Sequence, residues 1–241
     1  MSRQIMLPVY CYPFSIVEGT IFAEMIKVIR SRRKTISLII LPDGSLEIRA
    51  PLHTTEHQIR RLLEEKADWI RTRRALAERL RPKPRQYVRG ENFLFLGNSH
   101  KLEFCESSRQ PLTLDGVFIL KRSCLPHAQT IFTNWYKDQA RRVISERAAW
   151  FSSHTGIQFT RLKITSARTR WGSCSSSGTL SFTWRLVMAP LPVIDYVVVH
   201  ELAHILEHNH SSAFWNKVAA ILPDYKDRLE WLNKNGHSLS L

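Results

Sequence analysis

The alternation of apolar and polar positions over the first third of the chain predicts short strands followed by one long amphipathic helix. Residues 35–40 and 46–49 have the apolar character of strands, and the Pro-Asp-Gly sequence at 42–44 favours a turn between them. Thr55 and Gln58 have the spacing of a capping box, in which each side chain accepts the other residue's backbone N–H at the start of a helix. The apolar residues that follow recur at helical spacing: Ile59, Leu62, Leu63, Ile70, Leu76 and Leu80.

The next stretch predicts further strands and a second long helix. Pro-Lys-Pro at 82–84 ends the first helix, because proline lacks the N–H that a continuing helix needs. Segments around residues 93–96, 101–104 and 116–121 are strand-like, and we expect them to join the first strands in one twisted antiparallel sheet that carries the helix. Apolar residues at helical spacing predict the second helix over residues 128–153.

A domain boundary is expected between residues 1–125, a β-rich N-terminal region, and residues 126–241, the domain with the candidate chemistry. Gly156 is suited to cap the helix that opens the second domain. Farther on, residues 162–168 and 179–186 predict a β-hairpin. The predicted class is therefore α+β: an N-terminal antiparallel sheet with a long helix, then a mainly helical domain with a hairpin.

A helix near the C-terminal end carries the motif with the clearest chemistry. An apolar run at 196–199 leads into residues 200–204, which read His-Glu-Leu-Ala-His. Residues four apart on a helix lie one above the other, so His200 and His204 present their imidazoles to one point. Two neutral imidazoles suit a zinc ion, and Glu201 is placed to reach a water on the metal. Because the apolar run indicates a buried helix, where unpartnered polar groups are costly, a metal site is favoured over a chance match.

His210 is the preferred third ligand, and Glu207 is its rival. Glu207 shares a helical stripe with the two histidines, but three ligands on one straight helix converge poorly on a single ion. Asn209 is suited to a left-handed stop that turns the chain and returns His210 to the metal. Glu207 would then orient the imidazole of a ligand without itself binding the metal. Three protein ligands with an open fourth position are typical of a catalytic zinc site.

The charge of the chain broadens the range of partners. The 241 residues carry a formal net charge of +14, which favours nucleic acid, nucleotides or an acidic protein, although a solvated basic surface is about equally consistent. The first predicted helix has a basic face opposite its apolar stripe, made of Arg60, Arg61, Arg71, Arg73, Arg74 and Arg79. Such a face is either solvated or follows the phosphates of a nucleic acid.

The cysteines and the absence of long apolar runs indicate a cytoplasmic enzyme without a membrane partner. Cys11, Cys105, Cys124 and Cys174 are scattered, with no C-x-x-C pair, which favours a reducing compartment. No apolar run approaches the length needed to span a bilayer. Residues 1–19 lack the apolar stretch and cleavage site of a signal peptide.

Several short motifs are specific enough to indicate a family. They are Arg170-Trp171-Gly172-Ser173-Cys174, Trp184-Arg185-Leu186, Ala189-Pro190, the segment from Asp195 to His204, Asn209-His210-Ser211 and Phe214-Trp215, with Pro42-Asp43-Gly44, Ala50-Pro51 and Trp69-Ile70 upstream. Over nearly its whole length the chain resembles the YgjP-like metallopeptidase family, part of the zincin group that includes the WLM and SprT-like proteases. The resemblance implies a zincin-type C-terminal domain with Zn²⁺ held by His200, His204 and His210. It also implies that Glu201 is the catalytic acid and base. The chain departs from the family at Thr183, where asparagine is usual, and so loses an amide near the site.

This constellation predicts hydrolysis by a water that the metal activates. Zinc brings the pKa of its water toward neutrality, and Glu201 accepts a proton and later passes it to the leaving group. A developing oxyanion needs a donor, for which Arg170, Arg185 and Tyr225 are candidates, with structural roles at least as consistent. Cys174 is better explained as a buried turn cysteine than as a nucleophile or ligand.

Three functions compete on this evidence, and the resemblance favours the first. A metallopeptidase would cut a peptide or protein substrate, with the strand before the metal helix offering an edge to an extended chain. A zinc hydrolase of nucleotide phosphoanhydrides (a nucleoside triphosphate pyrophosphatase) would use the positive charge, although no Gly-rich phosphate cradle is present. A nucleic-acid-binding module with an incidental zinc would have no need of Glu201. A combined hypothesis is a DNA-associated protease recruited by the arginine-rich face.

Overall fold

A computed structural model describes residues 26–41, 43–80 and 83–241 of the chain. It divides into two compact units, Met1–Arg81 and Pro82–Leu241. Four sequence expectations fall on positions outside the described residues: the absence of a signal peptide over residues 1–19, the thiol of Cys11, and the prolines Pro42 and Pro82 of the predicted turn and helix stop.

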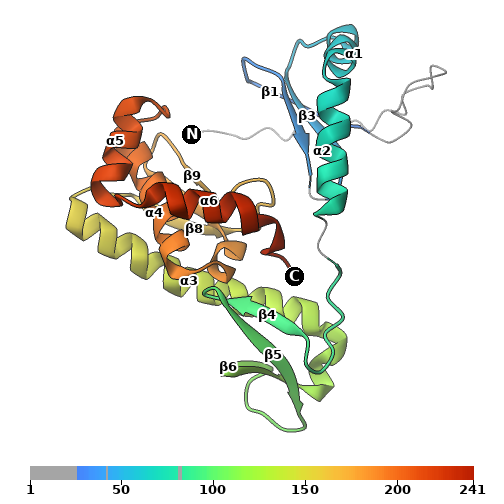
Figure 1. Cartoon of the computed structure of the whole chain (residues 1–241), viewed down its shortest axis with the longest axis vertical. Helices are drawn as coiled ribbons and strands as arrows, with labels where there is room; N and C mark the ends of the chain where they lie inside the picture. Colours follow the sequence, from blue (N-terminus) through green and yellow to red (C-terminus); the bar gives the residue numbers. More distant parts are fainter. Residues whose placement is uncertain (1–25, 42, 81–82) are drawn as a thin grey trace, which may run out of the picture. The chain divides into compact units, whose positions relative to one another are not determined.

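The first unit combines a three-stranded mixed sheet with two helices (Figure 1). Its elements are strands β1 (Lys27–Ser31), β2 (Ser37–Ile40) and β3 (Leu46–Pro51) and helices α1 (Glu56–Glu65) and α2 (Ala67–Arg79). The strand order is β1-β3-β2, with β1 parallel and β2 antiparallel to β3. Gly44 has a φ of +83° and donates its N–H to the Leu41 carbonyl, so a tight turn joins β2 to β3 as expected.

The capping box of the first unit is confirmed, but the long helix is divided. Thr55 Oγ1 accepts the Gln58 N–H at 3.3 Å, and Gln58 Oε1 accepts the Thr55 N–H at 2.9 Å. Lys66 ends α1 and precedes α2, while its N–H still donates to Leu62 O and its carbonyl still accepts from Ile70. No proline or glycine marks this position, which is why the apolar pattern predicts one helix. The core shared by sheet and helices comprises Ile26, Val28, Leu46, Ile48, Ile59, Leu63 and Ile70.

The second unit contains two sheets and, among the described residues, four α-helices. The four-stranded sheet, ordered β4-β5-β7-β6, is built from β4 (Asn92–Phe95), β5 (Asn98–Cys105), β6 (Leu112–Asp115) and β7 (Val117–Lys121). The three-stranded sheet, ordered β8-β10-β9, is built from β8 (Arg161–Thr165), β9 (Gly172–Cys174) and β10 (Thr179–Thr183). The helices are α3 (Ala128–Thr155), α4 (Leu191–Leu206), α5 (Ser212–Ile221) and α6 (Tyr225–Asn235), with 3₁₀ turns η1 (Arg122–His127), η2 (Trp184–Met188) and η3 (Gly236–Ser238). Across the described ranges, every helix is too short or too polar to cross a bilayer.

The α+β class is confirmed, whereas the predicted strand pairing is wrong in two places. The N-terminal strands form two sheets in separate units, and each sheet contains a parallel pair, β1/β3 and β5/β7. In the third sheet β8 runs parallel to β10, and the antiparallel partner of β10 is β9. The hairpin therefore exists with β9, rather than residues 162–168, as its first strand. Alternating side chains locate a strand but leave open which neighbour its edge joins.

The units divide after Arg81, whereas the sequence suggests a boundary after residue 125. The four-stranded sheet belongs to the second unit because its apolar side chains pack on α3. Phe132 of α3 lies with its ring centroid 4.4 Å from that of Phe93 and 5.2 Å from that of Phe118. All three rings are fully buried, so sheet and helix share one core.

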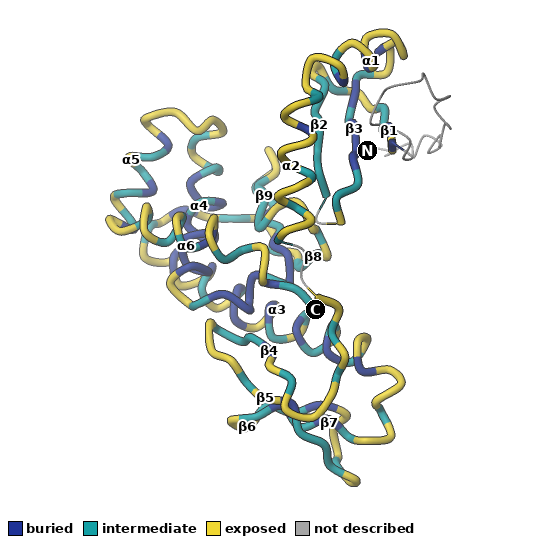
Figure 2. Tube along the Cα trace, turned by 45° about the vertical axis from the view of Figure 1, so that its right-hand side comes forward, coloured by how far each residue is buried: buried dark blue, intermediate teal, exposed yellow. Residues whose placement is uncertain are grey.

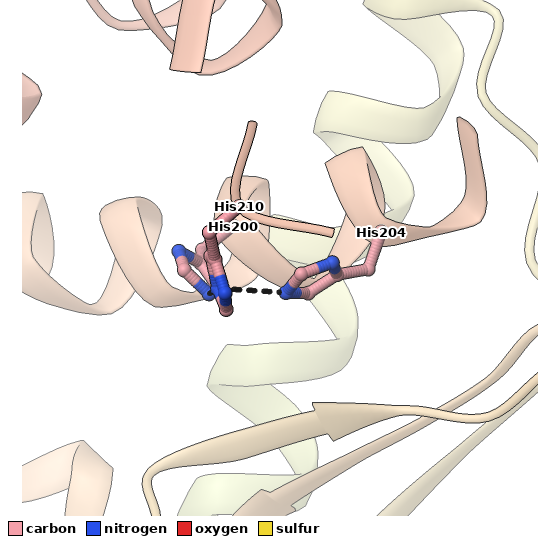
Figure 3. Close-up of side chains that lie close together, drawn as sticks. All are labelled: His200, His204 and His210. Atoms are coloured by element: carbon pink, nitrogen blue, oxygen red, sulfur yellow. Dashed lines mark hydrogen bonds between the residues drawn. The ribbon is translucent and has the colours of Figure 1, made fainter. Parts of the chain in front are cut away.

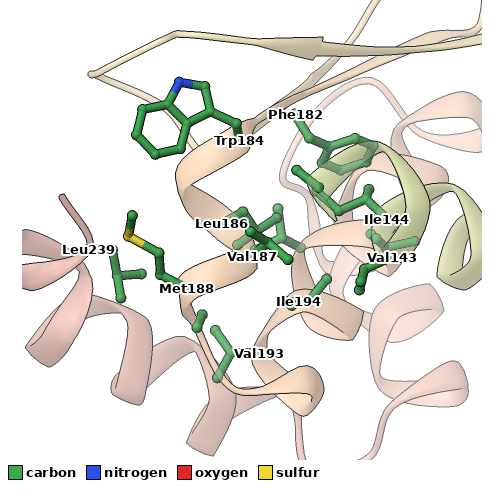
Figure 4. Packing of buried hydrophobic residues seen from close by; sticks show 14 of the residues in the cluster. Val143, Ile144, Phe182, Trp184, Leu186, Val187, Met188, Val193, Ile194 and Leu239 are labelled. Atoms are coloured by element: carbon green, nitrogen blue, oxygen red, sulfur yellow. The ribbon is translucent and has the colours of Figure 1, made fainter. Parts of the chain in front are cut away.

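Helix α4, which carries the His-Glu-x-x-His motif, lies in the middle of the second unit. Figure 1 shows α3 as the longest helix, and α4 packs against it. Leu186 and Val187 of η2 pack beside Ile194 of α4 and Ile144 of α3 (Figure 4), and these four side chains are fully buried. Most of α4 is buried (Figure 2), as the apolar run at its centre predicts.

An ion pair ties α4 to α3 and supports a stability prediction. The buried carboxylate of Asp195 accepts hydrogen bonds from Arg147 Nε at 2.5 Å and Arg147 Nη2 at 2.9 Å. We expect Arg147→Met to lower the free energy of unfolding by about 3 kcal/mol, because Asp195 would stay buried without its partner. Urea unfolding followed by circular dichroism measures the change.

Arg141→Met is the matched control, since the Arg141–Asp138 pair lies exposed on the same helix. It should cost less than about 1 kcal/mol. Equal losses in the two variants would contradict the role assigned to burial.

Candidate metal centre

Helix α4 stops before the third histidine. Pro190 is its N-cap, and Pro192 lies in the first turn, where the missing N–H has no helical acceptor to lose. Glu207 ends the helix in an extended conformation, with φ −144° and ψ 107°. The predicted left-handed stop at Asn209 is wrong, because among the described non-glycine residues only Tyr87 and Leu96 have positive φ. The chain has already left the helix at Glu207, and the turn that follows brings His210 back.

His200, His204 and His210 meet at one point (Figure 3). The Nε2 atom of His210 lies 3.1 Å from Nε2 of His200 and 3.2 Å from Nε2 of His204. One ligand atom from each ring lies within 4.8 Å of the other two. In the described part of the chain this is the one group of three or more histidine, cysteine or acidic side chains able to share an ion. Three converging imidazole nitrogens are a donor set that fits zinc.

Glu207 acts on this group through its backbone and not through its carboxylate. Its carbonyl oxygen lies 3.0 Å from Nδ1 of His204. A protonated Nδ1 that donates to this carbonyl leaves the Nε2 lone pair directed at the common point. The extended backbone at Glu207 thus supplies the orienting contact that the sequence assigns to its side chain.

An aromatic ring from α5 supports the three histidines. Phe214 is fully buried, and its ring centroid lies 4.5 Å from that of His204 and 4.9 Å from those of His200 and His210. The Ser211 hydroxyl caps α5 by accepting the Phe214 N–H at 3.3 Å. This cap fixes the start of α5, and with it the ring against which all three imidazoles pack.

Burial keeps His200 and His204 in the form that binds metals. Burial, first, and the neighbouring His204 and His210, second, lower the pKa of His200 to about 4. Burial also lowers the pKa of His204, although its hydrogen bond to Glu207 acts in the opposite direction. Neutral imidazoles carry the lone pair that a metal requires.

Glu201 is buried beside the histidines in contact with the edge of a sheet. Only 5% of its surface is exposed, and burial raises its pKa to about 7, against the opposing influence of the positive charge of Arg170. Gly172 of β9 lies against this side chain. A Cβ at Gly172 would lie 2.5 Å from Oε1 and 2.6 Å from Cγ of Glu201. Only a glycine leaves room for the carboxylate where it now lies.

The histidines and Glu201 open onto a cavity of about 310 Å³. It is lined by Gly172, Ser173, Cys174, His200, Glu201, His204, His208 and His210. Cys174 is a half-buried residue of β9 in this lining, so its interpretation as a buried turn cysteine is wrong. Burial and the charge of Glu201 raise the pKa of its thiol, which keeps it a weak nucleophile.

The three candidate oxyanion donors lie in different surroundings, all outside the lining of the cavity. Arg170 is exposed, and its charge acts on Glu201. Arg185 stacks on the ring of Trp184, with Cζ 4.3 Å from the ring centroid, and donates to backbone carbonyls before β9. Tyr225 stacks on Trp215, with ring centroids 5.4 Å apart. Arg170 is therefore the candidate whose charge reaches the site, whereas the contacts of Arg185 and Tyr225 are structural.

Thr183 donates a hydrogen bond to the connection between β8 and β9, at the position where the sequence resemblance predicts asparagine. Its buried hydroxyl donates to the Ala167 carbonyl at 2.8 Å, and its N–H donates to the Trp171 carbonyl at 3.0 Å. These bonds attach the connection between β8 and β9 to the end of β10. The threonine thus holds the segment that precedes Gly172.

The sequence does not identify Gly172, Phe214 or His208 as parts of the site. Gly172 carries a usable signal, since a glycine inside a strand often marks the close approach of another group. Phe214 has the pattern of an ordinary core residue, and His208 lies one residue before the expected helix stop at Asn209. The contacts of Phe214 and His208 with the site depend on the turn after α4, and that of Gly172 depends on the packing of β9 against α4. Periodicity describes neither.

Comparison with known proteins gives one family match. A family model described as "YgjP-like, metallopeptidase domain" matches residues 34–235. No curated protein matches the chain. Among solved structures, the metallopeptidase zymogen abylysin of Pyrococcus abyssi is 21% identical over 38% of this chain and 93% of that chain, with a TM-score of 0.35.

Proposed function

The chain belongs to the YgjP-like metallopeptidase family, and from this we propose that it is a zinc-dependent peptidase in which Glu201 is the general base and acid. The observation that carries the proposal is the convergence of three histidine Nε2 atoms on one cavity beside Glu201, a buried glutamate of α4. A site that served only to stabilise the fold would have no need of that glutamate. Three side-chain ligands also leave a coordination position for water and substrate.

His200, His204 and His210 would hold the ion. When bound, zinc supplies Lewis acidity that polarises a substrate carbonyl and makes water more acidic. Glu201, one residue after the first ligand, would take a proton from the attacking water and return it to the leaving amine. Gly172 would keep the Glu201 carboxylate in position for both transfers, because the backbone of β9 lies directly against it.

Strand β9 offers a place for an extended peptide. The strand order β8-β10-β9 leaves β9 at an edge, and Gly172, Ser173 and Cys174 all line the cavity. An edge strand presents unpaired backbone groups that an extended chain can join. This arrangement supports a peptide or protein substrate lying along β9 with its scissile bond over the histidines.

Metal removal tests the proposal. We expect 1,10-phenanthroline to lower the cleavage of an unfolded protein such as casein at least tenfold, because a chelator that binds zinc strongly competes with the three histidines for the ion. Adding back Zn²⁺ should restore cleavage. Elemental analysis before and after chelation links activity to metal content, and unchanged cleavage by metal-free protein would refute the proposal.

Hydrolysis of nucleotide phosphoanhydrides is the second candidate, and the charge near the site favours it. Residues 147–194, which include the whole β8-β10-β9 sheet, contain no Asp or Glu. Release of phosphate or pyrophosphate from a nucleoside triphosphate, measured beside casein cleavage in the same chelation series, distinguishes the two activities.

The arginine-rich face of the first unit gives less support to DNA recruitment. Arg71 pairs with Asp68, and Arg73 lies over the ring of Trp69. Acidic side chains alternate with the basic ones along both helices: Glu56, Glu64, Glu65, Asp68 and Glu78. This mixed pattern is typical of a solvated helix surface, and a DNA-associated protease remains a hypothesis.

A further inference from the structure

The sheet beside the cavity has a one-sided charge. Between Glu146 and Asp195 the sequence contains no acidic residue, while its basic residues are Arg147, Arg161, Lys163, Arg168, Arg170 and Arg185. Residues 161–183 of this stretch form the β8-β10-β9 sheet and its connections. The only carboxylate that lines the neighbouring cavity belongs to Glu201. A substrate that enters along β9 therefore meets a positive surface.

Among the described residues, no carboxylate pairs with the basic side chains of the β8-β10-β9 sheet and its connections, and two of these side chains lie in the connection that leads into β9. Arg147 is paired with Asp195, and Arg185 donates to two backbone carbonyls. Arg168 and Arg170, in the connection from β8 to β9, are exposed and form no ion pair within the described residues. Their guanidinium groups are free to bind an anion.

Arg170 lies close in the chain to the cavity lining, and Arg168 lies beside Arg185. Arg170 stands two residues before Gly172, which lines the cavity and whose backbone lies against Glu201. Burial, first, and the charge of Arg168, second, lower the pKa of Arg185 to about 10. Arg185 also donates to the carbonyls of Ser166 and Ala167, the two residues before Arg168, so Arg168 and Arg185 are like charges near one another. A bound anion would relieve this repulsion.

We propose that Arg168 and Arg170 form an anion subsite at the β9 edge of the cavity, which selects substrates with a negative group next to the bond that is cleaved. In a peptide this group is a glutamate or aspartate side chain or the chain-terminal carboxylate. Guanidinium groups bind carboxylates and phosphates through paired, charge-assisted hydrogen bonds. The inference rests on the proposed hydrolytic function, because only a hydrolase has a cleaved bond beside which the negative group can lie. Binding of the anion itself does not require catalysis.

Binding to an inactive protein separates recognition from cleavage. The probes are two fluorescent peptides that differ only by Glu or Gln at the positions flanking the central bond, bound to the zinc-loaded Glu201→Gln protein and followed by anisotropy. We expect the Glu peptide to bind about tenfold more tightly at low salt, the size of one charge-assisted hydrogen bond at an exposed site. The preference should shrink as salt screens the charges.

Arg168→Gln and Arg170→Gln should each reduce the preference for the Glu peptide. Arg142→Gln removes the same charge from an exposed position on α3 and should leave it unchanged. Equal affinity for the two peptides, or a preference that survives both variants, overturns the inference. A preference lost equally in Arg142→Gln also overturns it, because net charge alone would then explain the result.

A nucleoside triphosphate used as competitor identifies the anion. If the triphosphate displaces the peptides, and Arg168→Gln weakens binding of the triphosphate more than binding of the Glu peptide, the subsite is supported with phosphate as its preferred ligand. Cleavage is measured separately with the Glu201-containing protein. Failure to cleave either peptide counts against the peptidase, while the binding preference still decides the fate of the subsite.

Discussion

Replacing Glu201 by glutamine should abolish hydrolysis while the metal stays bound. Glutamine has nearly the shape of glutamate, so it fits against Gly172, but it does not accept a proton from water. We expect kcat to fall by about 10² to 10⁴-fold, the range for removal of a general base and acid. The three histidines are unchanged, so zinc content by elemental analysis should equal that of the parent protein. Steady-state cleavage of casein or a quenched peptide measures the loss.

Glu230→Gln is the matched control for this substitution. Glu230 is an exposed residue of α6, and the change removes the same charge far along the chain from the motif. Its activity should equal that of the parent. Full activity of Glu201→Gln, with duplex DNA still bound, would instead support the nucleic-acid-binding module. If the parent protein cleaves no peptide but hydrolyses a nucleoside triphosphate, and Glu201→Gln loses that hydrolysis, the nucleotide hydrolase is supported.

Gly172→Ala should lower kcat roughly 100-fold, the cost expected when a reacting group is displaced by about 1 Å. The new methyl group would lie 2.5 Å from Oε1 of Glu201, so the carboxylate or strand β9 must move. Because the displaced group would take part in the chemical step, the loss should appear in kcat more than in KM. Zinc content should be retained, since Gly172 is not a ligand candidate.

A double variant shows whether Gly172 acts through Glu201. If the glycine only positions the carboxylate, Gly172→Ala combined with Glu201→Gln should be no slower than Glu201→Gln alone. Losses that multiply would mean that the alanine disturbs β9 or the metal in another way. Thermal unfolding of all three variants identifies any general loss of structure. If the double variant is no slower than Glu201→Gln and all three variants stay folded, Gly172 is a positioning residue that acts through Glu201.

Local sequence patterns determined the features that depend on near neighbours. The capping box at Thr55 and Gln58 and the glycine cap at Gly156 both appear in the structure, because each requires only residues within one helical turn. The burial of α4 follows in the same way from its apolar run. The proximity of His200 and His204 follows from the helical repeat itself.

Tertiary structure alone decided the features that join distant segments. The parallel pairs β1/β3, β5/β7 and β8/β10, the packing of β4–β7 on α3, and the contact of Gly172 with Glu201 bring together residues far apart in sequence. The position of His210 beside the other two histidines depends on the helix end at Glu207, where the backbone is extended. No local stop signal in the sequence indicated an end at this residue. The physical reason is that periodicity records which face of an element is apolar. The identity of the partner depends on the shape and hydrogen-bonding edges of the rest of the chain.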